Sequence, residues 1–447
     1  MKDSVGVYIS VPFCRAKCTY CNFASGVFGP ERMDRYVERV CTEVRGARLA
    51  VERMGAELPG RADTIFFGGG TPSLLGAGQM RKIFEAVRGE LEVAADAEVT
   101  LECAPGQMGE ETLDEMLRQG MNRVSFGVQS FVDREAAAVG RLHTREMCLA
   151  EIQRMRAAGV TNINVDLIVG LPLQTSESWR ESVQVAVQSR VPHVSVYMLE
   201  VDEDSRLGRE MLADGARYGA GAAPSEDETA EWYGAACEWL KADGIGQYEI
   251  SNFAREGFAS RHNVKYWRRD PYVGFGLDAH SMLRSSEGAV RWANTSDLDG
   301  YMAGEGREQG TGNREQGTGK REQGSARTGN REQGTGNREQ GSGLIQTAAG
   351  ANLPGFRVGS APEVEVVGRE QAFEEAMFLG LRLNEGVDLE DLRTEFGEGL
   401  MREAVAALSD VEEAGLVVVE GGRVRLTGRG RVASNEVFSR LLVGATV

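Results

Sequence analysis

The first half of the chain alternates short apolar runs, typical of buried strands, with longer amphipathic stretches that are typical of helices. Strands joined through helices pair in parallel by right-handed crossovers, so this alternation restricts the fold to the α/β class. The expected strands are Val5–Val11, Asp63–Phe67, Glu98–Glu102, Arg123–Phe126, Asn162–Val169 and His193–Leu199. The expected helices are Arg32–Met54, Gly78–Glu90, Glu110–Gln119, Arg145–Ala158 and Ser176–Ser189.

Polar residues at the carboxyl ends of these strands narrow the choice of fold. Glu102 ends the third strand, Gln129 ends the fourth, and Asp166 lies within the fifth. Burying an unpaired carboxylate costs free energy, so acidic residues in apolar strands indicate that the strands face a common polar site. Six strand–helix units of this kind predict a partial (β/α)6 barrel, in which these side chains converge on the mouth. An open doubly wound sheet is the alternative.

The C-terminal tail predicts a separate α+β module. A helix is expected upstream at Glu226–Asp243, followed by a Gly-rich stretch at Tyr272–Ser281. The elements expected in the tail are helices at Ala372–Leu383, Leu389–Glu395 and Glu398–Ala414, a hairpin of Leu416–Glu420 and Arg423–Leu426, and a last helix at Gly428–Leu442. Helices followed by a small hairpin are typical of a winged-helix-like domain. Because the chain is acidic and has no basic recognition stripe, we interpret this domain as a cap or docking module and not as a DNA reader.

A low-complexity segment precedes that tail. Five copies of Arg-Glu-Gln-Gly begin at Arg307, Arg314, Arg321, Arg331 and Arg338. The period of seven has no apolar positions that could form a coiled-coil seam, and glycine recurs throughout, so we predict a disordered insert. The predicted domains are therefore a barrel core at 1–217, an extension of the barrel at 218–303, the insert at 304–343 and the C-terminal domain at 344–447.

Three cysteines carry the strongest chemical signal. Cys14, Cys18 and Cys21 lie on one short loop directly after the first expected strand. Three thiolates at this spacing can bind three irons of a four-iron cluster and leave the fourth iron open, while Arg15 and Lys17 favour the thiolate form. A zinc site would usually need a fourth ligand, and an odd count of seven cysteines fits a disulfide framework poorly.

The composition excludes several classes of partner. The chain has 447 residues, 41% of them hydrophobic, and a formal net charge of −17. This charge argues against nucleic acid as the main partner. No apolar run approaches the roughly 20 residues that a membrane-spanning helix needs. With no signal peptide recognised at the start, the expectation is a cytoplasmic protein.

A glycine-rich turn follows the second expected strand. In the segment Gly68–Pro72, three glycines allow the backbone to approach a ligand closely and expose its polar groups, although a tight strand-to-helix turn explains them equally well. Arg141 is a candidate for contacting a ligand carboxylate near the same mouth. Structural hydrogen bonding is the more ordinary role for each of these polar residues taken singly.

Together these segments resemble the radical S-adenosylmethionine (SAM) superfamily. The C-x-x-x-C-x-x-C loop after a first strand and the Gly68–Pro72 turn are its hallmarks. The resemblance implies a 4Fe–4S cluster held by Cys14, Cys18 and Cys21, with SAM on the open iron, where reductive cleavage yields a 5′-deoxyadenosyl radical. It also implies that the SAM site is lined by Tyr8, Tyr20, Gly69, Gly70, Thr71, Glu102, Gln129, Arg141 and Asp166. Ala104 and Leu173 differ from the residues that are common at these positions in the family. Neither difference affects the three cysteines.

Within that superfamily, the chain is similar to two related families, oxygen-independent coproporphyrinogen III oxidase and the heme chaperone HemW, over nearly all of its length outside the insert. The oxidase carries an additional cysteine two positions after the third, where this chain has Phe23. The segment Arg261–Trp267 resembles the H-N-x-x-Y-W motif of HemW, and a histidine can serve as an axial ligand of heme iron. His262 is therefore a candidate heme contact, with a hydrogen-bonded structural histidine as the alternative. His280 is a weaker candidate.

The expected function is that of a HemW-type heme chaperone, which binds heme, a 4Fe–4S cluster and SAM. It delivers heme to an acceptor hemoprotein, which the resemblance implies is a respiratory one. An electron donor for the cluster is a further expected partner. The first alternative is the oxidase, which decarboxylates propionates in porphyrin biosynthesis and which Phe23 disfavours. The second is a structural iron–sulfur or zinc scaffold that binds partners without SAM.

Overall fold

The computed structural model describes residues 3–203, 205–285, 288–303 and 364–440. The insert predicted at 304–343 lies outside the described residues. Among the described helices, none is long and apolar enough to cross a membrane.

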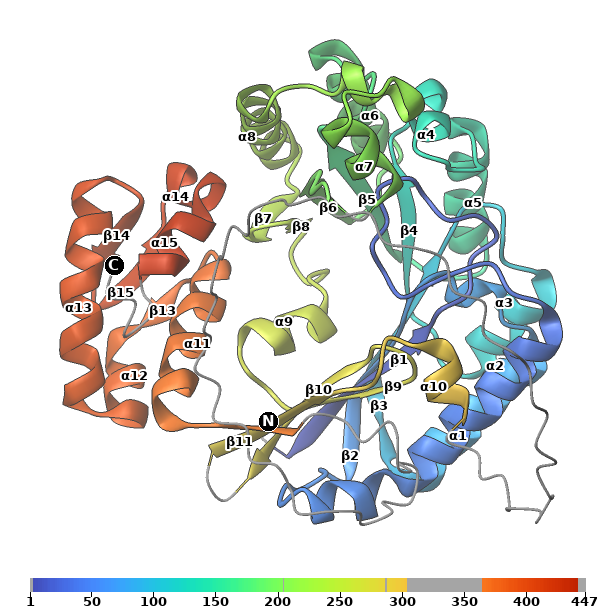
Figure 1. The fold of residues 1–447 in the computed structure, drawn as a ribbon, viewed down its shortest axis with the longest axis horizontal. Helices are drawn as coiled ribbons and strands as arrows, with labels where there is room; N and C mark the ends of the chain where they lie inside the picture. Colours follow the sequence, from blue (N-terminus) through green and yellow to red (C-terminus); the bar gives the residue numbers. More distant parts are fainter. Residues whose placement is uncertain (1–2, 204, 286–287, 304–363, 441–447) are drawn as a thin grey trace, which may run out of the picture.

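Six parallel strands form the wall of a partial barrel. They are β1 (Ser4–Val11), β2 (Arg61–Gly69), β3 (Glu92–Cys103), β4 (Arg123–Gln129), β5 (Asn162–Val169) and β6 (His193–Met198). Each strand pairs with the next one along the chain, in the order β1-β2-β3-β4-β5-β6. A doubly wound sheet reverses its strand order at a switch point, so this sequential order excludes that alternative and confirms the predicted barrel. Figure 1 shows the strongly curved sheet with its helices on the convex side.

The helices that follow these strands cover the outer face. They are α1 (Pro30–Arg53), α2 (Ala77–Glu90), α3 (Glu110–Arg118), α4 (Asp133–Ala138), α5 (Arg145–Ala157) and α6 (Ser176–Gln188), with the short turn η1 (Pro72–Leu74) after β2. Apolar residues of the strands pack against them in one continuous core. The short helix α4 is absent from the sequence prediction, whereas the five predicted helices of this half are confirmed.

The two faces of the strands differ in chemistry. On β1, Val5, Val7, Ile9 and Val11 point outward and are fully buried in the core. The residues that alternate with them face the inside of the barrel, because successive side chains of a strand point to opposite faces. On β4 the inward positions begin with Arg123 and end with Gln129, and the interior of the barrel is therefore polar.

Shorter strands extend the sheet at both edges. Its full order is β12-β11-β10-β9-β1-β2-β3-β4-β5-β6-β8-β7. The added strands are β7 (Gly246–Glu249), β8 (Asn252–Ala254), β9 (Tyr272–Phe275), β10 (His280–Ser285), β11 (Gly288–Ala293) and β12 (Val364–Val367). Strand β9 is parallel to β1, and the strands beyond it are antiparallel. The remaining helices of this region are α7 (Arg206–Leu212), η2 (Arg217–Ala222), α8 (Glu226–Ala242) and α10 (Leu298–Ala303).

Helix α9 (Arg261–Trp267) lies on the concave side of the sheet, inside the barrel (Figure 1). The carboxylate of Glu98 accepts hydrogen bonds from the backbone N–H groups of Arg261 and His262, both at 3.0 Å, at the positive end of this helix. Lys265 forms an ion pair of 2.9 Å with Asp63. A Cβ on Gly6 would lie 2.9 Å from the Lys265 side chain, so only glycine leaves room for the helix here.

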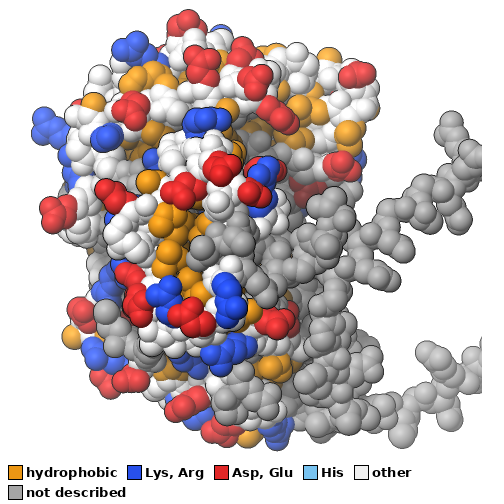
Figure 2. Space-filling view, turned by 90° about the vertical axis from the view of Figure 1, so that its left-hand side faces the viewer, with side chains coloured by type: hydrophobic (Ala, Val, Ile, Leu, Met, Phe, Trp, Pro, Cys, Tyr) orange, Lys and Arg blue, Asp and Glu red, His pale blue; other side chains and the backbone are white. Residues whose placement is uncertain are grey.

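The C-terminal unit combines helices with a small sheet. Its elements are α11 (Arg369–Arg382), β13 (Val387–Asp388), α12 (Leu389–Phe396), α13 (Glu398–Glu413), β14 (Val417–Glu420), β15 (Arg423–Leu426), α14 (Gly428–Val432) and α15 (Ser434–Arg440). The predicted hairpin turns at Gly421 and Gly422, both of which have positive φ, as a tight hairpin requires. The predicted last helix is divided at Ala433 into α14 and α15. On the face in Figure 2, basic and acidic side chains are interspersed around a column of apolar ones.

This unit is joined to both edges of the sheet. Strand β12, which leads into α11, pairs with β11, and the backbone of Ile250 donates a hydrogen bond of 3.1 Å to Arg382 beyond the other edge. The Arg382 guanidinium lies 4.3 Å from the centre of the Trp267 ring. Glu375 on α11 is 3% exposed and forms ion pairs with Arg291 at 2.8 Å and Arg269 at 3.3 Å. Both connections hold the unit across the open side of the barrel.

We expect Glu375→Ala to lower the free energy of unfolding by about 3–5 kcal/mol, because it leaves two partly buried guanidinium groups without their carboxylate. Urea denaturation followed by tryptophan fluorescence measures this change. The exposed Glu52 on α1 provides the control, since Glu52→Ala should alter stability by only about 0.5 kcal/mol. Equal effects of the two substitutions would show that the Glu375 ion pairs do not hold the C-terminal unit.

Candidate functional site

The cysteine loop connects β1 with α1 and is closed at its base by backbone hydrogen bonds. Cys14 donates to the Gly26 carbonyl and Gly26 donates to the Pro12 carbonyl, both at 2.9 Å. Phe13 is fully buried and packs edge-on against the rings of Phe28 and Tyr36. The loop is therefore fixed to the mouth of the barrel by an apolar anchor that immediately precedes the first cysteine.

Each of the three thiols has a different polar neighbour. The Thr71 hydroxyl lies 3.8 Å from Cys14 Sγ, Arg141 Nη1 donates to Cys18 Sγ at 3.4 Å, and the Ser25 hydroxyl lies 4.0 Å from Cys21 Sγ. All three cysteines are free and half-buried. Burial raises the pKa of the Cys21 thiol, and its neighbour Lys17 acts in the opposite direction.

Across the described ranges, no three His, Cys, Asp or Glu side chains lie close enough together to ligate a single metal ion, the three thiols included. A four-iron cluster makes a different demand, because each thiolate binds its own iron and the sulfurs need not surround one point. The three free thiols on one anchored loop, one of them touched by a guanidinium, are a donor set that fits a cluster.

The turn after β2 lies directly against this loop. Gly70 donates its N–H to the Val11 carbonyl at 2.8 Å, and a Cβ on Gly70 would lie 2.8 Å from the Phe13 carbonyl and 3.0 Å from Cys14 Sγ. Gly69 has a φ of +104°, which L side chains rarely adopt. The glycines predicted as a ligand-binding turn are thus required for the close approach of two backbone segments, and they expose the turn to the space beside the cysteines.

An outer cavity of about 470 Å³ opens between the turn, the cysteine loop and strands β9 and β10. Most of its wall is apolar or aromatic, and the polar groups include the turn and His280. Its lining includes Tyr8, Phe23, Gly69, Gly70, Tyr266 and His280. Phe23 is 61% exposed, at the rim.

The end of β4 is held in a strained conformation beside the cysteine loop. Gln129 has a φ of +67°, and its buried Oε1 has no hydrogen-bond partner within the described part of the chain. Arg141 donates to the Gly127 carbonyl as well as to Cys18. A Cβ on Gly127 would lie 3.0 Å from Arg141 Nη2. An unsatisfied buried amide oxygen next to the cysteine loop is what a site shaped for a polar ligand contains.

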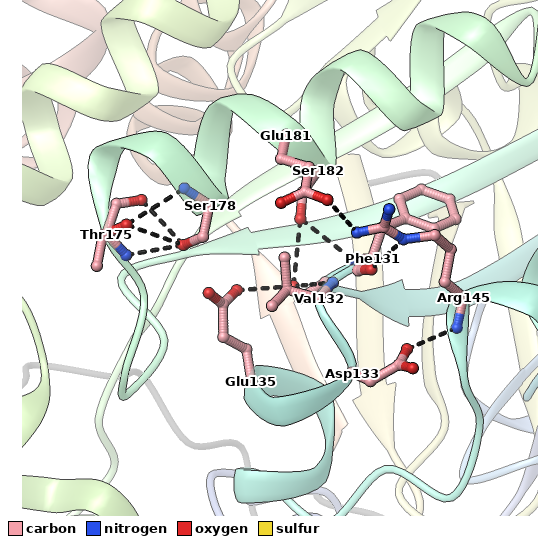
Figure 3. A network of polar contacts seen from close by, with 10 residues as sticks. Phe131, Val132, Asp133, Glu135, Arg145, Thr175, Ser178, Glu181 and Ser182 are labelled. Atoms are coloured by element: carbon pink, nitrogen blue, oxygen red, sulfur yellow. Dashed lines mark hydrogen bonds and ion pairs between the residues drawn. The ribbon is translucent and has the colours of Figure 1, made fainter.

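A network of polar contacts fastens the segment that follows Gln129 (Figure 3). The Ser182 hydroxyl on α6 accepts a hydrogen bond of 3.1 Å from the Phe131 N–H, and Arg145 Nε on α5 donates to the Phe131 carbonyl at 2.7 Å. Ser130 Oγ donates to Glu135 at 2.8 Å. These contacts hold the backbone on the far side of Gln129 and so stabilise its left-handed conformation.

A second, inner cavity of about 230 Å³ lies deeper in the barrel and shares Tyr8 and Tyr266 with the outer one. Its wall is mainly polar and is contributed by the strands β1–β6 and by α9. The lining residues are Tyr8, Phe66, Glu102, Arg123, Ser125, Asn164, Asp166, Ser195, Tyr197, His262, Asn263 and Tyr266.

Two carboxyl groups of the inner cavity hold protons more tightly than usual. Burial, and then the nearby Asp166, raise the pKa of Glu102 to about 8, whereas the Gly69 N–H and Arg123 act in the opposite direction. Burial also raises the pKa of Asp166, against hydrogen bonds from Ser195, Asn164 and Ser125. Ser125 Oγ donates to Asp166 at 3.1 Å and Asn164 Nδ2 at 2.7 Å. Near neutral pH, Glu102 is mainly a neutral hydrogen-bond donor in the ligand-free protein.

His262 is a buried neutral histidine with a partner on each ring nitrogen. It is 1% exposed, its Nδ1 lies 2.7 Å from the Thr64 hydroxyl, and its Nε2 lies 2.8 Å from the Tyr266 hydroxyl. Burial, followed by the charges of Lys265 and Arg123, lowers the pKa of His262 to about 3. In this structure His262 is therefore a hydrogen-bonded structural histidine, which is the alternative to a heme contact. Ligation of iron by Nε2 would require the hydrogen bond to the Tyr266 hydroxyl to break.

The structure brings the predicted site residues together at one end of the barrel, in three groups. Tyr8, Gly69 and Gly70 line the outer cavity, whereas Glu102, Asp166 and His262 line the inner one. The remaining residues lie around the cysteines: Thr71 at Cys14, Arg141 and Tyr20 at Cys18, and Gln129 at the end of β4. Their roles toward a cofactor stay predictions.

Arg123 and Tyr266 line the cavities but are not among the site residues predicted from the sequence. Arg123 begins a strand predicted to be apolar, yet the segment Arg123–Gln129 places a polar residue or glycine at every second position. That period of two is the signal that could have identified an inward-facing polar row. Tyr266 belongs to the predicted motif, but no pattern in the sequence indicates that it lines two cavities.

Known proteins match this chain over most of its length. Residues 8–186 match the Radical SAM superfamily, and residues 367–433 match the HemN C-terminal domain. The heme chaperone HemW of Bacillus subtilis is 30% identical to this chain, and the match covers 97% of this chain and 98% of that protein. HemW of Mycobacterium tuberculosis is 31% identical, and the match covers 98% of this chain and 94% of that protein. A solved structure also matches, that of coproporphyrinogen III oxidase (HemN) from Escherichia coli, described as a radical SAM enzyme. The TM-score is 0.73 at 20% identity, and the match covers 99% of this chain and 91% of that one. At that identity it shows the fold alone.

We expect Cys18→Ser to reduce the iron bound by anaerobically reconstituted protein severely, because serine removes one of three thiolate ligands. Iron content and the visible absorbance of the cluster measure the loss. Cys237→Ala, on α8, is the control for removal of a cysteine elsewhere and should retain the iron of the wild type. If Cys18→Ser keeps the full iron content, this loop is not the cluster site.

A second prediction concerns the pH dependence of stability. Between its ordinary pKa of 4.5 and its folded value of about 8, Glu102 retains a proton that the unfolded chain releases, so wild-type stability falls as the pH rises through this window. Glu102→Gln cannot ionise and removes this slope. From about pH 5 to about pH 8, the variant should therefore gain on the order of a few kcal/mol relative to the wild type. Urea denaturation at both pH values measures the gain, and parallel pH profiles would contradict the raised pKa.

Proposed function

Because this chain belongs to the HemW family of the radical SAM superfamily, we propose that it binds heme and passes it to an acceptor hemoprotein. Membership of the superfamily implies a 4Fe–4S cluster and SAM as cofactors. The observation that carries the proposal is the identity of 30% or more to HemW proteins over nearly the whole of both chains. The acceptor, an electron donor for the cluster and the cytoplasmic location stay predictions from the sequence.

In this proposal the cofactors occupy the barrel mouth. Cys14, Cys18 and Cys21 bind the cluster, which supplies an electron for reductive cleavage of SAM when both are bound. The turn at Gly69 and Gly70 offers backbone groups to the methionine part of SAM, with Thr71 beside it. Tyr8, Tyr20, Glu102, Gln129, Arg141 and Asp166 complete the proposed SAM surroundings. The unsatisfied oxygen of Gln129 and the free space beside the turn support this assignment.

Heme is the proposed cargo, and the aromatic wall of the outer cavity is a surface on which a macrocycle can pack. His262 is the proposed iron contact from the sequence motif. Its pKa of about 3 keeps the imidazole neutral, which an iron ligand requires, but its Nε2 must leave the Tyr266 hydroxyl. His280 competes for the role: it is exposed at the outer cavity, and among the described residues no hydrogen bond or ion pair of its ring is found.

Coproporphyrinogen III oxidation is the alternative function. The likeness to the solved oxidase supports it only at the level of the fold. Phe23 argues against it, because the oxidase family carries an additional cysteine at this position, and here a mainly exposed phenyl ring lies at the rim of the outer cavity. A scaffold without SAM is a third possibility, against which the glycine turn and the orphaned Gln129 oxygen argue.

Heme titration of the wild type should produce a Soret band, and His262→Ala should weaken it at least severalfold. Tyr266→Phe is the matched variant: it removes the hydroxyl that occupies Nε2 and leaves the ring, so heme binding should be retained or strengthened. Absorbance spectroscopy measures each titration, and thermal unfolding verifies that each variant is folded. If His262→Ala binds heme as the wild type does while His280→Ala does not, the iron contact moves to His280.

The same preparation separates the two functions. With SAM and a reductant, the wild type should leave coproporphyrinogen III unconverted while it binds heme. Robust formation of protoporphyrinogen would favour the oxidase, and the absence of a Soret band in the wild type would remove heme binding altogether.

A further inference from the structure

Arg123 is a buried cation whose guanidinium has no direct polar contact among the described residues. It begins β4, is 1% exposed and ranks among the largest fully buried side chains. Its Nε has no hydrogen-bond partner, and over the described ranges its guanidinium group has neither a hydrogen bond nor an ion pair. The group lines the inner cavity. Buried charges are costly unless they are paired, so a guanidinium in this position needs an explanation.

Three other buried charged groups among the described residues have direct partners. Glu43 accepts hydrogen bonds from Asn294 and Gly276 at 2.7 and 3.0 Å, Lys265 is paired with Asp63, and Glu375 is paired with Arg291. These three groups are satisfied by direct contact in structural parts of the fold. Arg123 lacks such a contact and faces a cavity.

The carboxyl groups of the same cavity do not neutralise Arg123 by contact. The oxygens of Asp166 accept hydrogen bonds from Ser125 and Asn164, and no ion pair joins Glu102 or Asp166 to Arg123 across the part of the chain that the structure describes. Burial raises the pKa of both carboxyl groups, whereas the charge of Arg123 acts in the opposite direction. The guanidinium therefore faces the cavity without direct contact to a carboxylate oxygen, and this position is open to an added anion.

The other groups of the wall suit one class of anion. Tyr8, Tyr197 and Tyr266 bring hydroxyl groups, and Asn263 brings an amide. A guanidinium fork binds a carboxylate through two parallel hydrogen bonds, and neighbouring hydroxyls can complete its shell. The cavity, at about 230 Å³, is smaller than the roughly 300–1,000 Å³ of pockets that enclose a drug-sized ligand, so it fits an acid group or a short side arm.

We propose that Arg123 is the anchor of an anion site in the inner cavity and binds a carboxylate group of the ligand. The carboxylate has two possible sources, a small free acid or a propionate arm of heme. The second source rests on the proposed heme function, and the shared Tyr8 and Tyr266 walls place the inner cavity directly beside the outer one. Arg123 and Gln129 are the two ends of β4, about 20 Å apart along a strand, so the guanidinium is remote from the cysteine loop. Tyr8, Glu102 and Asp166 of the proposed SAM surroundings lie between them and line the same cavity.

The first experiment uses thermal unfolding of the whole chain with sodium propionate, against sodium chloride at equal ionic strength. Propionate should raise the Tm of the wild type and leave that of Arg123→Met unchanged. Without ligand, Arg123→Met should have a higher Tm than the wild type, because an apolar side chain of similar length replaces an unpaired buried charge. Arg134→Met, at an exposed position on α4, is the control and should retain the propionate response.

Arg123→Lys keeps a positive charge but not the planar fork, so it should bind propionate about tenfold more weakly than the wild type. This variant also serves if Arg123→Met does not fold. The inference is overturned if propionate stabilises Arg123→Met or Arg123→Lys as strongly as the wild type, or if it does not stabilise the wild type and the heme experiment shows no dependence on Arg123.

The second experiment identifies the source of the carboxylate. Heme and heme dimethyl ester, which lacks free carboxylates, are titrated into the wild type and Arg123→Met. If a propionate arm is bound, the wild type should prefer heme over the ester by about tenfold or more, and Arg123→Met should bind both equally. If the wild type and Arg123→Met show the same preference between heme and its dimethyl ester, while propionate still stabilises only the protein with Arg123, the site binds a small free acid. Failure of the wild type to bind heme refutes the proposed function and leaves the propionate test of Arg123 intact.

Discussion

The rest of the structure depends on one constraint: six parallel strands are apolar on their outer face and polar on their inner face. Parallel strands are usually buried by apolar residues on both sides. Here the outer positions of β1, such as Val7 and Ile9, are packed under the helices, while Tyr8 between them faces the cavities. A barrel built in this way cannot fill its own interior with apolar side chains, and its lumen becomes a polar binding space.

A polar lumen must be closed without being filled, and two parts of the chain do this. Helix α9 occupies the concave side and is fixed to the strands by Glu98 and by the Lys265–Asp63 ion pair. The C-terminal unit extends between the two edges of the sheet and is fastened through Glu375 and Arg382. The motif that contains His262 and Tyr266 is therefore first a structural device, which separates an inner polar cavity from an outer, more aromatic one. Any role of its histidine in heme contact is added to that structural role.

The sequence predicts what is local and repeats. The six core strands, the helices between them and the terminal hairpin are recoverable because each has its own apolar period or turn residues, and the strand Asn162–Val169 agrees at both ends with β5. The strands β7–β12 are not recoverable, because segments of a few residues become strands only by pairing with an edge that already exists. The same limit applies to His262: its partner Thr64 lies 198 positions away, so no local pattern reveals that Nδ1 is occupied. Arg123 is an intermediate case. The alternation of polar and apolar residues along Arg123–Gln129 is visible in the sequence, but a short apolar strand is the simpler interpretation of the same segment.

The two cavities also bear on how a cargo and a reactive cofactor can share one barrel. The cysteine loop and the Gly69–Gly70 turn are at the rim of the outer cavity, whereas the carboxyl groups and Arg123 line the inner one. Tyr8 and Tyr266 belong to both walls, and Tyr266 is in turn held by His262 Nε2 at 2.8 Å. Any group that displaces this hydroxyl from His262 must move a side chain that both cavities contact. A ligand that moves Tyr266 in one cavity therefore also changes the wall of the other cavity.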